Sequence, residues 1–228
     1  MKKITVFLSD DHTVFREALR FLLESFDDIE VIGEADNGQT AVDETRRLRP
    51  DVVVMDIAMP VLNGLEAARC IAREVAATRV LILSTYSDNQ HVQQAVEAGV
   101  SGYLAKETAS GELLQAIRDV CKGNTFFSPP ITKRLLEQSQ NRDLQSKSPA
   151  APTLTRRQTE VLQLVAEGYS NRRMASLLSL SVKTVEKHRQ AVMDRLDIHQ
   201  TANLTRYAVS SGLVESNCAP DGSRRARA

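Results

Sequence analysis

The sequence predicts an α/β domain with a doubly wound parallel sheet, followed by a small all-α domain. In the first 125 residues, short apolar runs alternate with amphipathic helical stretches, as in successive βα units. The runs Val52–Met55 and Val80–Leu83 are apolar without alternation, as expected of strands that are covered on both faces. From residue 153 the pattern becomes helical, with no strand signal. These three observations favour two domains of different class.

Five βα pairs account for the first domain. We expect strands at about 4–9, 29–35, 51–55, 79–84 and 101–104, and helices at about 13–25, 38–48, 64–74, 89–97 and 110–121. Ligands of such domains bind at the carboxyl ends of the strands, near the point where the strand order reverses.

The whole chain is expected to contain four segments. The α/β domain spans 1–125, a linker with a short helix (Ile131–Gln138) spans 126–152, and the helical domain spans 153–215. The linker prediction rests on 139–152, which has few apolar residues and two prolines. Residues 216–228 end in Arg-Arg-Ala-Arg-Ala and are expected to be a disordered tail. That tail either adds salt-dependent affinity for DNA or is inert, and we favour the second.

Charge is distributed unevenly although the whole chain is formally neutral. Residues 1–125 carry 13 Lys and Arg against 20 Asp and Glu, whereas residues 126–228 carry 16 against 9. An acidic, cation-binding domain joined to a nucleic-acid-binding domain would give this pattern. The three cysteines lack metal-ligand spacing, and no stretch has the roughly 20 apolar residues of a membrane span. The N-terminus shows no secretory signal, so we expect a cytoplasmic protein.

Chemically active side chains follow four of the expected strands. Asp10 and Asp11 follow the first, Asp56 the third, Ser84 the fourth, and Lys106 the fifth. Adjacent aspartates are usually solvated turn residues, and a single lysine is usually a surface charge. Their common position at strand ends instead indicates a pocket in which carboxylates hold Mg2+ and Asp56 accepts a phosphoryl group.

These residues give the first 125 positions a resemblance to a response-regulator receiver domain of the CheY type, with strand order 2-1-3-4-5. The resemblance rests on Asp10-Asp11, Asp56 with Met59-Pro60 and Gly64, Ser84, and Gly102-Tyr103-Leu104 before Lys106. It implies that Asp56 is the phospho-acceptor. It also implies that Asp10, Asp11, Asp56 and the backbone carbonyl of Ala58 hold magnesium, that Lys106 binds phosphate, and that Ser84 and Tyr103 form a conformational switch.

Two residues near the expected pocket bear on how long a phosphoryl group would last. Ala58 lies two positions after Asp56, and Tyr86 lies two positions after Ser84. Neither side chain positions a water molecule well, so the hypothesis is slow autodephosphorylation. Glu107 follows Lys106 where many receivers have proline, which removes the possibility of an X-Pro cis bond there.

The helical domain begins with a capping-box signature. Thr155 and Gln158 have the Thr-x-x-Gln spacing ahead of an apolar run, and Gly168 follows as a helix terminator. Short helices are then expected at Asn171–Leu178 and Val182–Leu196, joined by a Ser-Leu-Ser turn, which is a helix-turn-helix pattern. In the later helix we expect four residues to be core: Val182, Val185, Val192 and Leu196.

This module resembles the LuxR/FixJ-type helix-turn-helix. The marks are Leu154-Thr155, Glu160-Val161-Leu162, Glu167-Gly168, Asn171, Ala175, Leu178, Ser181, Thr184-Val185, His188 and Leu196. By that resemblance Glu186, Lys187 and Gln190 read bases, Lys183, Thr184 and Arg189 lie near phosphates, and His188 is structural. Glu186 either accepts a hydrogen bond from a cytosine amino group or repels phosphates. The expected fourth helix, about Thr201–Ser211, carries a stripe (Leu204, Tyr207, Ala208) that either dimerises or packs on its own domain.

Together the two resemblances imply a two-component response regulator of the NarL/FixJ class and not an enzyme. The expected partners are a sensor histidine kinase, double-stranded promoter DNA and, after phosphorylation, a second copy of the chain. Two alternatives remain. One is a constitutive DNA binder with a vestigial receiver, and the other is an aspartyl-phosphate phosphatase, which would need a second aspartate where Ala58 stands.

Overall fold

The computed structural model describes residues 2–86, 88–107, 110–133, 135 and 154–214. The chain divides into two compact units, Met1–Pro149 and Ala150–Ala228. The division falls among residues outside the described ranges, as do the expected tail at 216–228 and the expected linker from 136 to 152. None of the helices among the described residues is long and apolar enough to cross a membrane. Each unit is considered by itself below.

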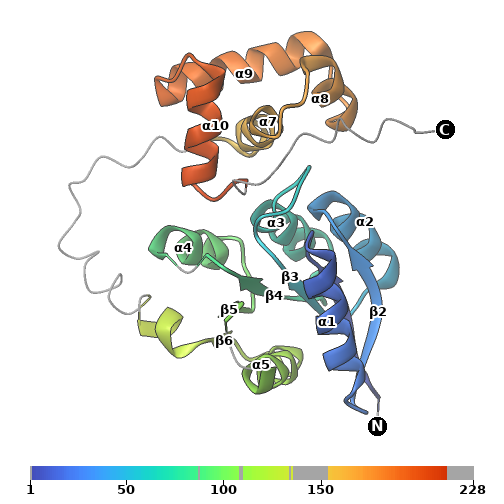
Figure 1. Ribbon diagram of the computed structural model, residues 1–228. Coiled ribbons are helices and arrows are strands. Elements are labelled where there is room, and N and C mark those ends of the chain that lie inside the picture. The colour runs from blue at the N-terminus through green and yellow to red at the C-terminus, as the bar shows by residue number, and fades with distance from the viewer. Residues whose placement is uncertain (1, 87, 108–109, 134, 136–153, 215–228) are drawn as a thin grey trace. The chain divides into compact units, whose positions relative to one another are not determined.

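The first unit alternates strands and helices in the predicted order (Figure 1). The strands are β1 (Ile4–Ser9), β2 (Ile29–Ala35), β3 (Val52–Met55), β4 (Arg79–Ser84), β5 (Gly102–Ala105) and β6 (Phe126–Phe127). The helices are α1 (Thr13–Glu24), α2 (Gly38–Leu48), α3 (Gly64–Glu74), α4 (Asn89–Glu97) and α5 (Ser110–Cys121). All strand pairs are parallel, in the order β2-β1-β3-β4-β5-β6. The α/β prediction is confirmed.

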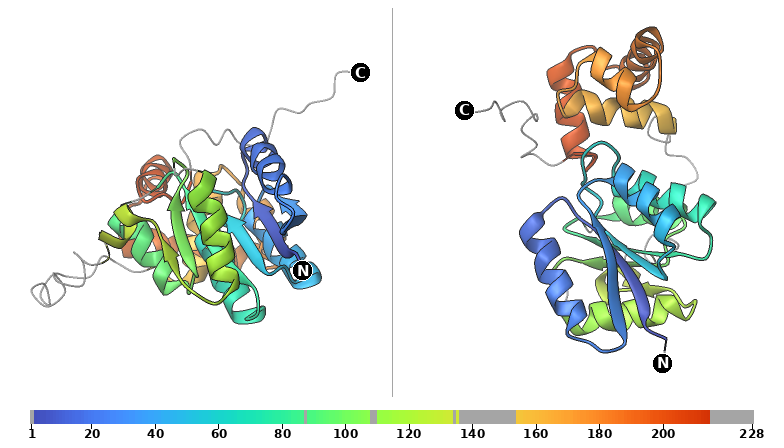
Figure 2. Two further views of the ribbon diagram at one scale, coloured as in Figure 1. Left: turned by 90° about the horizontal axis from the view of Figure 1, so that it is seen from below. Right: turned by 90° about the vertical axis from the view of Figure 1, so that its right-hand side faces the viewer.

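Two apolar cores lie on opposite faces of the sheet. Val53, Met55 and Tyr103 face the core that α2, α3 and α4 cover, whereas Val54 and Leu104 face the core that α1 and α5 cover. Figure 2 shows this layering, with helices on both sides of the sheet. Successive strand residues point to opposite faces, so covering both faces requires the unbroken apolar runs seen in the sequence.

The edge of the sheet differs from the prediction. We expected five strands and placed Phe126 and Phe127 in the linker, but they form β6, which pairs with Gly102 and Tyr103 of β5. Phe126 packs against the core under α5, and Phe127 packs against the opposite core. Two adjacent aromatic residues can cover both faces of a sheet edge, which explains the additional strand. Ile131 is also fully buried in the core that Phe127 touches.

The described residues of the second unit, 154–214, form four helices around one small core. They are α7 (Arg156–Ala166), α8 (Asn171–Leu177), α9 (Val182–Leu196) and α10 (Thr201–Ser210). The predicted capping box at the start of α7 is present, with Thr155 and Gln158 bonded reciprocally. Gly168 follows α7 with a φ of +85°, which suits glycine. Of the alternatives for the α10 stripe, Leu204 and Ala208 are buried in the core of their own unit, and Tyr207 packs against it.

Candidate functional site

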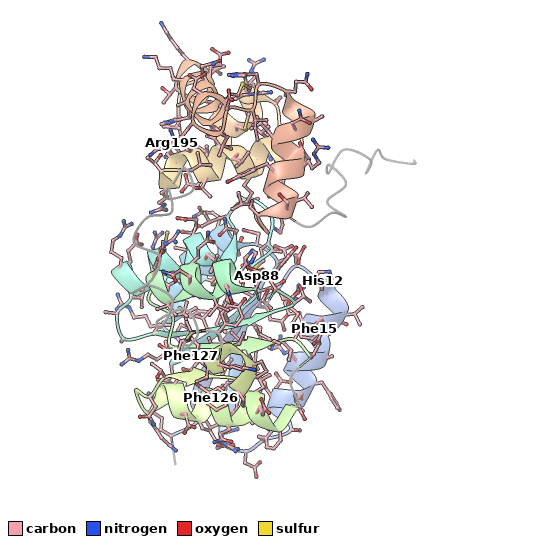
Figure 3. All side chains as sticks on the ribbon, turned by 90° about the vertical axis from the view of Figure 1, so that its left-hand side faces the viewer. His12, Phe15, Asp88, Phe126, Phe127 and Arg195 are labelled. Carbon is pink, nitrogen blue, oxygen red and sulfur yellow. The ribbon has the colours of Figure 1, made fainter. Side chains whose placement is uncertain are left out.

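Carboxylates from two neighbouring strands meet at one edge of the sheet. Asp56 follows β3 and is only 2% exposed, and Asp10 follows β1 and is equally buried. Asp11 is half-buried, whereas His12, at the N-terminal end of α1, is exposed (Figure 3). Ligand atoms of Asp10, Asp11, His12 and Asp56 all lie within 4.8 Å of one another. Three carboxylates at this spacing fit a hard cation such as Mg2+.

Lys106 holds two of these carboxylates. Its ammonium nitrogen lies 2.8 Å from Oδ2 of Asp56 and 2.8 Å from Oδ2 of Asp10. The lysine side chain is only 10% exposed. Because β5 delivers Lys106 to the same sheet edge as β1 and β3, three segments distant in the sequence form one ion-pair cluster.

Burial changes the protonation behaviour of this cluster. Desolvation raises the pKa of Asp56, the charge of Lys106 opposes this rise and the charge of Asp10 adds to it, so that the resulting pKa is about 6. Burial alone would lower the pKa of Lys106, but its contacts with the two aspartates outweigh burial and raise that pKa. At neutral pH Asp56 is therefore an ionised carboxylate that is more basic than an exposed aspartate.

The loop after β3 brings the backbone close to Asp56. Oδ1 of Asp56 accepts a hydrogen bond of 2.7 Å from the amide of Ile57. A Cβ atom on Gly64 would lie 1.8 Å from the carbonyl oxygen of Asp56, so only glycine fits there. Val61 has a φ of +68° between Pro60 and Leu62, which are joined by a backbone hydrogen bond of 2.8 Å. A β-branched residue in this γ-turn is strained.

Ser84 and Tyr103 are connected through the backbone of one residue. The amide of Tyr86 donates a 3.2 Å hydrogen bond to Oγ of Ser84, and the hydroxyl of Tyr103 donates to the carbonyl oxygen of Tyr86. Ser84 and Tyr103 are both fully buried. The ring of Tyr86 stacks on His91 of α4, with centroids 4.8 Å apart. Tyr86 therefore links Ser84, Tyr103 and α4 through two hydrogen bonds and a ring stack.

The side chains on the outer face of α9 are exposed, unlike those of the pocket. Lys183, Glu186, Lys187 and Gln190 are exposed, and Gln190 donates to Asp194 on the next turn. Ser181 caps the helix by accepting a hydrogen bond from the amide of Thr184, and Thr184 is half-buried. The face thus presents several donors and the carboxylates of Glu186 and Asp194 to solvent.

One prediction for α9 needs correction. Val182 was expected in the core, but this first residue of α9 is 40% exposed. Val185 and Val192 are buried and Leu196 packs against the core, as expected.

Arg189, which was expected near phosphates, makes hydrogen bonds within its own unit. It donates to Oδ1 of Asn171 at 3.2 Å and to Oγ1 of Thr201 at 2.7 Å. Arg189 therefore ties α9 to the start of α8 and of α10. His188, expected to be structural, is half-buried.

Comparison with known proteins decides the family. Residues 6–118 match the response regulator receiver domain, and residues 152–208 match the bacterial regulatory proteins of the luxR family. The transcriptional regulatory protein DegU of Brevibacillus brevis is 32% identical over 226 residues, covering 93% of this chain and 96% of DegU. The chain belongs to the two-component response regulators.

Solved structures agree with this assignment. The response regulator ChrA of a heme-sensing two-component system is 33% identical, covers 94% of this chain and all of its own, and has a TM-score of 0.52. RcsB of Salmonella enterica serovar Typhimurium, solved with promoter P1flhDC and phosphomimetic BeF3-, has a TM-score of 0.58, with 93% of this chain and all of that chain covered. At 22% identity RcsB supports the fold alone. As a response regulator with a luxR-type domain, this protein is a transcription regulator.

Three residues of this response regulator's pocket were not found from the sequence. His12 lies 3.4 Å from Asp10 and 3.1 Å from Asp11. Arg16 donates to the backbone carbonyl of Asp10 at 2.5 Å and pairs with Glu34 at 3.0 Å. Phe15 contacts Lys106. The only signal for them was their position directly after the acidic pair, where α1 begins.

Proposed function

We propose that phosphorylation of Asp56 controls DNA binding by this transcription regulator, with Mg2+ as the required ion. The observation that carries the proposal is the ion-pair cluster of Asp56, Asp10 and Lys106 at the carboxyl ends of the strands. A buried carboxylate that remains ionised beside a lysine is suited to accept a phosphoryl group.

The proposed chemistry is an in-line displacement at phosphorus. An oxygen of Asp56 attacks, and an O–P bond forms while the bond to the donor breaks and the leaving group departs with its electron pair. The donor is a phosphohistidine of a sensor kinase or a small acyl phosphate. Asp10, Asp11, Asp56 and the carbonyl of Ala58 would hold Mg2+, which neutralises charge on the phosphoryl oxygens. Lys106 binds one of these oxygens and Ser84 another.

The proposed switch follows from the hydrogen bonds of Tyr86. If Ser84 turns to a phosphoryl oxygen, the amide of Tyr86 loses its acceptor. The segment then shifts, and with it the carbonyl that holds the hydroxyl of Tyr103. The stack of Tyr86 on His91 passes this change to α4, where it alters pairing between two receivers.

The proposed DNA contact is the outer face of α9 in a major groove. Glu186, Lys187 and Gln190 would read base edges, and Lys183 and Thr184 would contact phosphates. Arg189 would act by orienting α9, since α8 and α10 hold its guanidinium. Two copies would place two α9 helices about one DNA turn apart. RcsB, which was solved bound to a promoter in the presence of a phosphomimetic, supports promoter DNA as the partner by analogy. Because promoter DNA is cytoplasmic in bacteria, the proposal places the protein there.

The phosphoryl group is proposed to be long-lived. Ala58 offers no polar group to an attacking water, and the ring of Tyr86 is occupied by its stack on His91. The receiver would assist its own phosphorylation and slow hydrolysis without being an enzyme for other substrates. A phosphoryl half-life of only seconds would contradict this.

The test compares the wild-type protein with Asp56→Asn. Each is incubated with Mg2+ and acetyl phosphate, and oligomeric state and binding to duplexes selected from a random pool are measured. We expect acetyl phosphate to increase dimer and DNA affinity in the wild type alone. Identical behaviour of the two proteins would favour a constitutive DNA binder with a vestigial receiver. Release of inorganic phosphate from many equivalents of donor would favour a phosphatase.

A further inference from the structure

Phe15 of α1 contacts the lysine of the pocket. The ammonium nitrogen of Lys106 lies 4.8 Å from the centroid of the Phe15 ring. The ring is half-buried and packs against the core that α1 and α5 cover. Figure 3 shows Phe15 on α1 next to the end that carries His12. The phenylalanine is thus fixed from the core side and meets Lys106 at the pocket.

The ring of Phe15 gives the ammonium group of Lys106 a contact in addition to the two carboxylates. Two carboxylate oxygens accept from it at 2.8 Å, and the aromatic face provides a third attractive contact. An ammonium within about 6 Å of a ring centroid is attracted by the negative charge of the ring face, most strongly where water is excluded. An aliphatic side chain of similar size would exclude the same water but provide no such attraction.

The geometry points to Phe15 as a positioning residue for Lys106, which holds the ammonium group where it meets a phosphoryl oxygen on Asp56. This inference rests on the proposed phosphorylation of Asp56. Phosphorylation changes what both carboxylates bind, because Asp56 becomes an acyl phosphate and Asp10 would bind the cation. The contact with Phe15 depends on neither change, so it is the one that can keep Lys106 in place through the reaction.

A second phenylalanine on the same helix provides a matched control. Phe21 is 81% exposed, six residues further along α1. Phe15→Leu removes the aromatic face at the pocket, whereas Phe21→Leu makes the same chemical change away from it. Phe15→Tyr keeps the ring and serves as the conservative variant. Pentafluorophenylalanine at position 15 keeps the shape and removes the negative face.

The first measurement needs no phosphoryl group. In NMR spectra of the full chain, the ring current of Phe15 should shift the ε-methylene protons of Lys106 upfield in the wild type, in Phe15→Tyr and in Phe21→Leu. The shift should vanish in Phe15→Leu. Unshifted protons in the folded wild type would overturn the inference at the level of geometry.

The second measurement is the affinity for beryllofluoride in the presence of Mg2+. We expect the half-saturating concentration to rise about three- to tenfold in Phe15→Leu and in the pentafluorophenylalanine variant. It should stay within about twofold in Phe15→Tyr and Phe21→Leu. Equal affinity of the wild type and the pentafluorophenylalanine variant would overturn the inference, and this comparison holds even if Phe15→Leu fails to fold. If the wild type binds no beryllofluoride, the proposed function fails, and with it the role of Phe15 in holding a phosphoryl-binding lysine.

Discussion

The pocket around Asp56 and the outer face of α9 differ in how their side chains are held. In the pocket, Asp56 and Lys106 are buried and bonded to one another. On α9, Lys183 and Lys187 are exposed to solvent. A pocket that binds a small phosphoryl group must be preorganised, whereas a face that meets DNA must be reachable. Substitutions in the pocket should therefore change the free energy of unfolding, whereas substitutions on the outer face of α9 should change the affinity for DNA.

The largest effect is expected from Gly64→Ala. The new methyl group would lie 1.8 Å from the carbonyl oxygen of Asp56, so the loop after β3 would have to move. We expect a loss of at least about 3 kcal/mol in the free energy of unfolding. Gly111→Ala is the control, because a Cβ there meets nothing within 4 Å and alanine favours α5. Urea denaturation of both variants measures the difference, and equal stabilities would contradict the close approach.

The next largest effect concerns how the free energy of unfolding of Asp56→Asn, measured without Mg2+, depends on pH. Folding raises the pKa of Asp56 from 3.8 to about 6, so the folded state opposes ionisation. Below about pH 4 Asp56 is protonated in both states and does not destabilise the wild type. As the pH rises to about 6, the unfolded state loses this proton more readily than the folded state, so the free energy of unfolding of the wild type falls. Relative to the wild type, Asp56→Asn should gain about 3 kcal/mol between these values and then level off. Denaturation in EDTA, followed by NMR signals of the receiver, tests this, and a pH-independent difference would contradict it.

Smaller effects are expected on α9, where Lys187→Ala should change DNA affinity and Arg189→Ala should change stability. Lys187→Ala should lower affinity for a selected duplex about tenfold and change the free energy of unfolding by no more than about 0.5 kcal/mol. Arg189→Ala loses hydrogen bonds to Asn171 and Thr201 and should cost about 1 to 2 kcal/mol of stability. Fluorescence anisotropy and thermal denaturation distinguish the two. If Arg189→Ala is stable and its DNA binding depends less on salt, Arg189 contacts phosphates, as the sequence predicted.

The smallest effect is a gain in stability from Val61→Asn. Val61 has a φ of +68°, which asparagine adopts more readily than a β-branched residue. We expect an increase of about 1 kcal/mol in the free energy of unfolding. Val14→Asn on α1 is the control, since Val14 is 81% exposed in a right-handed helix. A loss of stability in Val61→Asn would show that the packing of Val61 outweighs its strain.

Local patterns predicted most of the fold because each element depends on nearby residues. The apolar runs of β3 and β4 and the Thr155–Gln158 capping box all appear where the sequence placed them. The family and the transcription-regulator function also followed from such motifs. The position of β6 could not be predicted, because it depends on pairing with β5 across the whole of α5.

The site was predictable to the extent that its residues stand in motifs. Asp10, Asp56 and Lys106 meet as expected. The contacts of Arg16 with Glu34, and of Phe15 with Lys106, join segments that only the folded chain brings together. The internal hydrogen bonds of Arg189 likewise depend on how α8 and α10 pack around α9. Spacing within one helix does not contain that information.

The most direct test of the account is whether the state of the buried pocket changes the DNA affinity of the exposed face. Binding to one selected duplex is measured for the wild type and for Asp56→Asn, with and without beryllofluoride and Mg2+, at equal protein concentration. The account predicts that beryllofluoride raises the affinity of the wild type about tenfold or more and leaves Asp56→Asn unchanged. A wild-type affinity that is the same with and without beryllofluoride, although the pocket binds it, would contradict the account.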